Sequence, residues 1–417
     1  MNSRQRARKA LNHEEADRIP VDFGGTCVTG ISASTVSALR KYYRLEDKTP
    51  IKVIEPFQML GEIADDLKEK LSVDFVELSN IENVFGFKNE DWKPWRLFDG
   101  TEVLVPGKFN TSQEPDGSYL QYPQGDKSVS ACARMPKNGY YFDPLIRQQP
   151  IEENSLNPED NVEEFAPLSE QILKYFEKEA DYLYRNTDLS IVANIGGTAL
   201  GDIAIVPGPS LKHPKGIRDF EEWYISLIKR KEYIHDVYHM QIEVALKNIE
   251  SLKQAVSNKI DVFLVTDADF GTQRGQFISN ELYNELYKPF HKKINDWIHR
   301  NTTWKTFIHS CGAVSKLIPE FIDAGFDILN PVQLSAEGMD AKLLKEKYGA
   351  DIVFWGGGVD TQKTLPFGTK EEVAQQVKER IEIFSKGGGF VFNAIHNIQA
   401  KTPVENIASM IEAVKNY

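Results

Sequence analysis

His309 and Cys311 stand two residues apart, directly after the run Trp-Lys-Thr-Phe-Ile at 304–308. Such a run is typical of a strand, and residues i and i+2 at a strand end point to the same side. An imidazole and a soft thiolate on one side are two ligands of the kind that zinc prefers. His396 follows a second strand-like run, 389–394, and would be a third ligand. Three protein ligands that leave one position open are the pattern of a catalytic zinc site.

Spacing alone leaves other interpretations open, because a buried cysteine and two ordinary histidines would look the same. Cys27 follows the first expected strand and is a further ligand, a nucleophile or small-residue packing, whereas Cys132 is expected to be inert. His235 and His239 lie four apart on an expected helix, but the acid between them is Asp and not the Glu of a zinc protease. Two histidines in a groove of that helix are the favoured interpretation.

Acids and amides recur at the ends of the expected strands. They are Asp22, Glu77, Asn194, Asp267, Asp269, Gln333 and Asp360. Because ligands of α/β folds sit at the carboxyl ends of the strands, these side chains are candidates to face a substrate. Asp267 and Asp269 fall on one side of their strand end, as an acid/base pair or as support for a ligating histidine. We expect Asp269 and Gln333 to be catalytic, and Asn194 and Asp360 to bind a cofactor.

Strands and helices must alternate to position these residues. Eight strands are expected, near residues 21, 75, 191, 263, 306, 329, 353 and 391. Helices are expected over 4–11, 34–43, 59–71, 159–184, 216–257, 280–300, 313–324, 340–348, 369–385 and 403–415. Alternation predicts a parallel sheet, and eight units predict an α/β fold of the (βα)8 TIM-barrel type. A doubly wound sheet is the weaker alternative, because no Gly-x-Gly-x-x-Gly follows the first strand.

One segment breaks this alternation. Residues 83–150 are rich in aromatic residues, Gly, Pro and Asp, with turn dipeptides between short alternating runs. This pattern indicates a small β-meander. We therefore expect one barrel spanning 1–417, with 83–150 as a β-rich insertion within it.

Composition narrows the class of protein. The chain has 417 residues with 49 Lys and Arg against 61 Asp and Glu, a formal net charge of −12. This acidity argues against nucleic acid and against an anionic membrane surface as partners. Three cysteines rule out a disulfide framework, and no run approaches 18 apolar residues. The polar first 17 residues lack the apolar core of a signal peptide, so a reducing cytoplasm is the expected compartment.

Several longer motifs resemble a known family. They are Leu-Asn-His-Glu-Glu-Ala-Asp-Arg-Ile-Pro-Val-Asp at 11–22, Asp-Phe-Gly-Thr-Gln at 269–273, Asn-Pro-Val-Gln at 330–333, Gly-Gly-Gly-Val-Asp-Thr-Gln at 356–362 and Ala-Lys-Thr-Pro-Val-Glu-Asn at 400–406. Together they resemble the uroporphyrinogen decarboxylase superfamily over essentially the whole chain. The branch that they resemble most is that of the corrinoid-dependent methyltransferases, similar to methylcobamide:coenzyme M methyltransferases.

The resemblance implies a (βα)8 barrel and a zinc ion held by a His-x-Cys pair and a distant Cys. His309 and Cys311 match the pair, and His396 stands at the place of the distant Cys. This exchange keeps a metal ligand but removes one negative charge, so the resemblance does not determine the identity of the substrate. The decarboxylase itself grips its substrate's propionates with arginines near the first strand, and the run 21–27 contains no Arg. Porphyrinogen decarboxylation is therefore not expected.

The expected activity is methyl transfer between a methylcobamide and a small molecule, most simply a thiol. The chain has no Asp-x-His-x-x-Gly cobalamin motif, so the corrinoid would arrive on a separate protein or free. Demethylation of a methylated donor onto a corrinoid protein is the alternative direction. A further alternative, from another functional class, is a barrel that binds zinc or a ligand and is not an enzyme.

Overall fold

The computed structural model describes residues 1–46 and 50–417. Its strands are β1 Ile51–Glu55, β2 Leu60–Gly61, β3 Phe75–Leu78, β4 Lys93–Arg96, β5 Glu102–Val105, β6 Thr111–Gln113, β7 Tyr119–Gln121, β8 Ala133–Met135, β9 Asp143–Pro144, β10 Ser190–Ala193, β11 Val262–Thr266, β12 Lys305–His309, β13 Ile328–Asn330, β14 Val353–Trp355 and β15 Phe390–Val391. Its α-helices are α1 Ser3–Leu11, α2 Ala33–Tyr42, α3 Asp65–Leu71, α4 Glu170–Asn186, α5 Phe220–Lys229, α6 Lys231–Val256, α7 Asn280–Leu286, α8 Lys288–Asn301, α9 Ile318–Asp323, α10 Ala341–Tyr348, α11 Thr364–Phe367, α12 Lys370–Phe384 and α13 Val404–Lys415. Three short 3₁₀ helices are Pro123–Gly125, Glu153–Ser155 and Pro158–Asn161.

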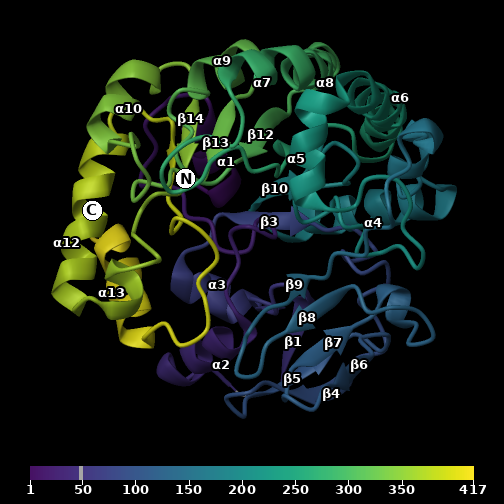
Figure 1. Cartoon of the computed structure of the whole chain (residues 1–417). Helices are drawn as coiled ribbons and strands as arrows, with labels where there is room; N and C mark the ends of the chain where they lie inside the picture. The colour runs from purple at the N-terminus through teal and green to yellow at the C-terminus, as the bar shows by residue number, and fades with distance from the viewer. Residues whose placement is uncertain (47–49) are drawn as a thin grey trace.

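A parallel sheet of seven strands lies at the centre of the fold, in the order β15-β14-β13-β12-β11-β10-β3. Helices α4 to α13 lie around this curled sheet (Figure 1). The seven strands are seven of the eight expected from the sequence. The α/β class with a parallel sheet is thereby confirmed, and parallel strands place all their carboxyl ends at one edge.

The expected strand near residue 21 is reduced to single bridges. Val21 makes one parallel bridge to Phe392, just after β15, and another to Val73, just before β3. Gly24, at φ +85°, turns the chain away directly afterwards. The segment therefore lies between the two edges of the sheet without forming a regular strand of its own.

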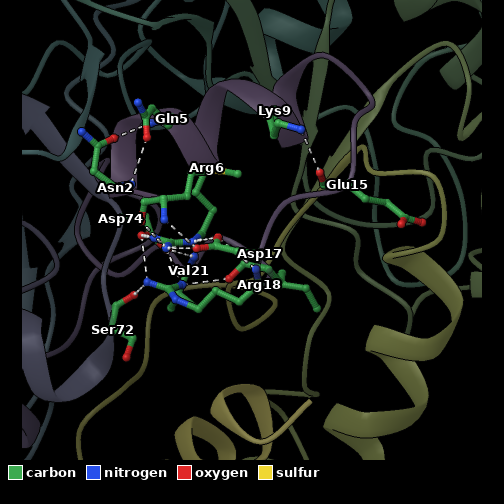
Figure 2. A network of polar contacts seen from close by, with 12 residues as sticks. Asn2, Gln5, Arg6, Lys9, Glu15, Asp17, Arg18, Val21, Ser72 and Asp74 are labelled. Carbon is green, nitrogen blue, oxygen red and sulfur yellow. Dashed lines mark hydrogen bonds and ion pairs between the residues drawn. The ribbon is translucent and has the colours of Figure 1, made fainter.

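A buried ion cluster holds this segment in place (Figure 2). The Asp74 carboxylate is fully buried and accepts from Arg6 Nη1 at 2.7 Å, from Arg18 Nη1 at 2.6 Å and from the Val21 N–H at 2.8 Å. Arg6 also pairs with Asp17 at 2.7 Å. Because Asp74 directly precedes β3, these contacts tie α1 and the Val21 segment to one edge of the sheet.

The two faces of the sheet have different neighbours. On the inner face, side chains from all seven strands form one apolar cluster that includes Ala7 and Leu11 of α1. The α1 backbone is bonded to the loops before β10 and β15, through Arg4 N to Asp188 O and Gly389 N to Ala10 O. Helix α1 thus covers the inner face at the amino ends of the strands, which leaves the carboxyl ends for a site.

Two smaller sheets lie to one side of the central one (Figure 1). One is the antiparallel meander β6-β7-β8-β9, and the other has the order β2-β1-β5-β4. Strands β4 to β9 fall within 83–150, where the sequence indicates a meander. Strands β1 and β2 precede residue 83 and were not expected. The single-barrel division of the chain, with 83–150 as its insertion, stays a prediction.

Three expected helices start later than their sequence pattern suggests, and one of them is 313–324, in which α9 begins only at Ile318. The pattern over 59–71 becomes helical only at Asp65, because Leu60 and Gly61 pair with β1. The pattern over 159–184 is interrupted at Pro167, and α4 begins when the Ser169 side chain caps Ile172 N. Along the described parts of the chain, no helix has both the length and the apolar character needed to cross a bilayer.

Candidate metal centre

His309, Cys311 and His396 come together at the carboxyl ends of the strands. His309 ends β12, and it shares the inner face with Phe307, two residues earlier. Cys311 follows in the loop, and His396 comes five residues after β15. One ligand atom from each of the three side chains lies within 4.8 Å of the others. The structure thus brings together the three residues that the sequence suggests as ligands.

The donor set fits a zinc ion. Cys311 Sγ lies 3.4 Å from His309 Nε2. Two atoms bound to one tetrahedral zinc, at about 2.05 Å for nitrogen and 2.3 Å for sulfur, lie about 3.6 Å apart. The ring centroids of His309 and His396 lie 5.3 Å apart with planes at 78°. The three side chains could therefore hold one zinc ion and leave a fourth position open.

Asn330 prepares His309 for a metal. It ends β13, directly beside His309 in the register of the sheet, and its Oδ1 lies 2.6 Å from His309 Nδ1. Asn330 Nδ2 donates to the Trp355 carbonyl, so its oxygen is the atom that faces the ring. His309 must then donate from Nδ1, which leaves the lone pair on Nε2. The sequence pattern marks Asn330 only as part of the motif at 330–333, and its place beside His309 in the strand pairing is the signal that identifies its role.

We expect Asn330→Ala to weaken zinc binding by about 10- to 100-fold, because His309 loses the acceptor that orients its ring. Competition with a coloured chelator measures the affinity. Asn295→Ala is the matched control, since Asn295 is also fully buried but donates to Ala324 O, at the end of α9. Equal affinities of the Asn330 variant and the wild type would contradict the assigned role.

The hydrogen bond of His396 does not orient its ring for metal binding in the way that Asn330 orients His309. His396 Nδ1 accepts a hydrogen bond from the Asn397 N–H at 2.8 Å. The neutral ring therefore carries its proton on Nε2. To bind a metal through either ring nitrogen, His396 must give up this hydrogen bond, because Nδ1 then carries either the metal or the proton.

Asp269 and Gln333 position the loop that carries Cys311. Asp269 Oδ1 accepts from the Cys311 N–H at 2.6 Å and lies 4.0 Å from His309 Nε2. Gln333 Oε1 accepts from the Gly312 N–H at 2.8 Å. Gly312 has φ +89°, and a Cβ there would lie 2.4 Å from the Gly271 backbone, so only glycine fits. Both predicted catalytic residues thus border the cluster, and their catalytic roles stay predictions.

The two residues expected to bind a cofactor bond within their own loops. Asn194 Oδ1 accepts from Gly196 N after β10. Asp360 Oδ1 accepts from Gln362 N and Lys363 N after β14. Neither side chain contacts the three candidate ligands through a hydrogen bond in the described structure. Cofactor binding by these two residues stays a prediction.

Burial sets the protonation of the candidate ligands. It lowers the pKa of His309, and it lowers the pKa of His396 to about 4. Both rings are therefore neutral at physiological pH, as metal binding requires. Burial raises the pKa of the Cys311 thiol, and the Asp269 carboxylate raises it further. Without a cation the thiol keeps its proton, and a bound zinc would ionise it.

Further acids lie around Cys27, and one of them, Asp267, also interacts electrostatically with His309. We call Cys27, Glu55, Glu77, Asp202 and Asp267 the acidic chamber. Burial raises the pKa of both Glu55 and Glu77 to about 7. Burial and repulsion from Asp267 raise the pKa of Asp202, and burial raises the pKa of Asp267. Burial raises the pKa of the Cys27 thiol, and all four carboxyl groups add to this effect. Among these residues, Glu55 and Asp202 were missed by sequence reasoning, since Glu55 ends a strand that was not expected.

We expect Glu77→Gln to stabilise the metal-free protein at pH 8 and to change its stability little at pH 5. The pKa of Glu77 is higher in the folded protein, so its stabilising contribution is complete below pH 4.5 and is lost as the pH rises through about 7. The expected gain at pH 8 is about 1–3 kcal/mol in the free energy of unfolding. Urea unfolding at both pH values measures it, with the exposed Glu102→Gln as control. An equal effect at pH 5 and pH 8 would show that charge is not the cause.

Comparisons with known proteins agree with this fold. The family model for uroporphyrinogen decarboxylase (URO-D) matches residues 209–417, half of the chain. A segment of 47 residues, 11% of the chain, is 36% identical to the uroporphyrinogen decarboxylases of three Coxiella burnetii strains, and it covers only 13% of their length. A methyltransferase from Methanosarcina mazei superposes with a TM-score of 0.55 at 14% identity, over 100% of this chain and 99% of that one. At this low identity, the similarity shows that the two proteins share a fold.

Proposed function

The chain belongs to the uroporphyrinogen decarboxylase (URO-D) family, and from that premise we propose that it is a zinc-dependent methyltransferase. It would move a methyl group between a methylcobamide and a small-molecule thiol. The observation that carries the proposal is the cluster of His309, Cys311 and His396, whose ligand atoms lie within 4.8 Å of one another. Its place at the carboxyl ends of the strands fits a (βα)8 barrel in which the Val21 segment is the eighth strand.

His309, Cys311 and His396 would hold the zinc ion, whose positive charge would supply the acidification of a thiol at neutral pH. His309 would bind the ion through Nε2, in the orientation set by Asn330. Asp269 holds the Cys311 backbone in place through the bond at 2.6 Å, and Gln333 does the same for Gly312. These contacts keep the donors in a fixed arrangement while the substrate exchanges.

The chemistry is a displacement at the methyl carbon. The thiol sulfur donates its electron pair to this carbon as the carbon–cobalt bond breaks, and the bonding electrons stay on the cobalt. The thiol proton is released to solvent. With the neutral His396 in place of a thiolate, the centre carries one negative charge less. A thiol at this centre would therefore be more acidic and less nucleophilic.

The chain would work with a cobamide that arrives free or on a separate corrinoid protein. The run 21–27 contains no arginine, which disfavours decarboxylation of a propionate-bearing porphyrinogen as the activity. With this function we expect the protein to be located in the cytoplasm, because the site needs a reduced cysteine.

Methylcobalamin and a panel of small thiols test the function. We expect the zinc-loaded protein to convert thiol into methyl thioether over many turnovers, as followed by mass spectrometry. A chelator should stop the reaction, and zinc should restore it. Transfer from a methylated donor to reduced cobalamin, without transfer to any thiol, would assign the opposite direction. Stoichiometric zinc without methyl transfer in either direction would indicate a zinc-binding protein that is not a methyltransferase.

A further inference from the structure

His235 and His239 lie one helical turn apart on α6 and are not part of the candidate metal centre. Helix α6 packs against α4 and α8 around the central sheet (Figure 1), and its buried face carries Ile234, Tyr238 and Gln241. The two histidines lie beside that face and are exposed, with 58% of the His235 side chain accessible. The proposed methyl transfer uses neither of them.

The two imidazole rings are parallel and close to each other. Residues four apart on a helix lie above one another on one face, and here the ring planes are within 3° of parallel with centroids 6.5 Å apart. Two imidazoles bound to one metal ion at about 2.05 Å have centroids about 4.5–5.5 Å apart, so the rings need to approach by about 1–2 Å. Rotation of two exposed side chains supplies that shift. The ring of Phe290 in α8, with its centroid 5.3 Å from that of His235, supports this histidine from one side.

Both rings keep a nitrogen lone pair available. In the described part of the chain neither ring makes a hydrogen bond, in contrast to His309 and His299, whose ring nitrogens have partners. The contact between His235 Nδ1 and Asp236 Oδ1, at 3.8 Å, is too long for a hydrogen bond. Each neutral imidazole therefore offers one free ligand atom.

Acidic residues accompany the pair along the helix. Over residues 232–246, α6 carries three acids, Glu232, Asp236 and Glu243, and no Lys or Arg. Glu243 pairs with a lysine of α8 at 2.6 Å. In the described structure neither Glu232 nor Asp236 pairs with a Lys or Arg, so their charge attracts a cation to this face of the helix.

We propose that His235 and His239 form a second metal site, which binds a divalent ion of the nickel, copper and zinc group through one nitrogen of each ring. Imidazole suits these ions, whereas calcium and magnesium prefer oxygen ligands. Water fills the remaining positions of the ion. With only two protein ligands, this site holds its metal more weakly than the centre of His309, Cys311 and His396. Dialysis therefore empties it and leaves the zinc content of that centre unchanged.

Titration calorimetry with Ni²⁺ tests the site, on the full chain without a histidine tag. Ni²⁺ is the probe because, unlike Cu²⁺, it does not oxidise the three free cysteines. His235→Ala and His239→Ala should each weaken Ni²⁺ binding about 100-fold, since a single ring cannot chelate the ion. The same titrations in a Cys311→Ala background separate this site from the candidate metal centre, and the loss should be the same there.

Two variants serve as controls. His213→Ala removes an exposed histidine from the loop before α5 and should leave Ni²⁺ binding unchanged. The double variant Glu232→His with His235→Ala keeps two exposed histidines on α6 but places them about 10.5 Å apart along the helix, and it should bind Ni²⁺ as weakly as His235→Ala.

Wild-type affinity in the double variant, or in either single variant of the pair, would overturn the site. A loss in His213→Ala equal to that in His235→Ala would show unspecific binding and overturn it as well. So would the absence of Ni²⁺ binding by Cys311→Ala protein that retains His235 and His239.

Discussion

Cys311→Ala is expected to lose zinc and, with it, all methyl transfer above background. The thiolate is the one anionic donor in the cluster, and its Sγ lies 3.4 Å from His309 Nε2. Zinc sites of small peptides bind with about 10–16 kcal/mol from four ligands, so one thiolate accounts for about 3–4 kcal/mol. The affinity for zinc should fall by roughly 100- to 1,000-fold. Metal analysis after dialysis and a chelator competition measure this loss.

The other two cysteines are the matched controls. Cys132 is buried in the meander sheet and contacts Gln121 O, and Cys132→Ala should keep one zinc per chain. Cys27 lies in the acidic chamber but outside the ligand cluster, and Cys27→Ala should also keep the metal. Full zinc in the Cys311 variant would exclude Cys311 as a ligand. Loss of zinc in the Cys27 variant would mean that the ligand set is incomplete.

Asp74→Ala is expected to reduce the free energy of unfolding by about 3–5 kcal/mol. The carboxylate is fully buried and balances Arg6 and Arg18, and it also accepts from the Val21 N–H. Its removal leaves Arg18 without its carboxylate partner, Arg6 with Asp17 alone, and the buried Val21 N–H without its acceptor. Urea unfolding followed by circular dichroism measures the change.

A surface pair gives the control for this loss. Arg96 and Glu102 are both largely exposed, and Glu102→Ala should cost less than about 1 kcal/mol. The double variant Arg18→Ala with Asp74→Ala should be no less stable than Asp74→Ala alone, because Asp74 is the carboxylate partner of Arg18 and the double variant removes the charge left unpaired. An additive loss in the double variant would mean that packing, and not the unpaired charge, explains the effect.

The sequence predicted most of the central sheet, because a buried parallel strand is a short apolar run between helices and can be read locally. It failed where tertiary contacts override the local pattern. Leu60 and Gly61 lie in a helical pattern but pair with β1, and Ile19 to Phe23 resemble a strand but form only the bridges of Val21. In both places the neighbouring elements decide which backbone groups find partners.

The sequence by itself determined the pair His309 and Cys311, because alternation along a strand places residues two apart on one side whatever the rest of the chain does. The tertiary structure alone decided the rest of the site. Strands β12 and β15 are separated by β13 and β14, which in a flat sheet would place them about 14 Å apart. Only the curl of the sheet and the loop after β15 bring His396 to within 4.8 Å. The same curl gathers Asn330, Glu77 and Asp267 from separate strands, and that long-range geometry leaves no trace in local spacing.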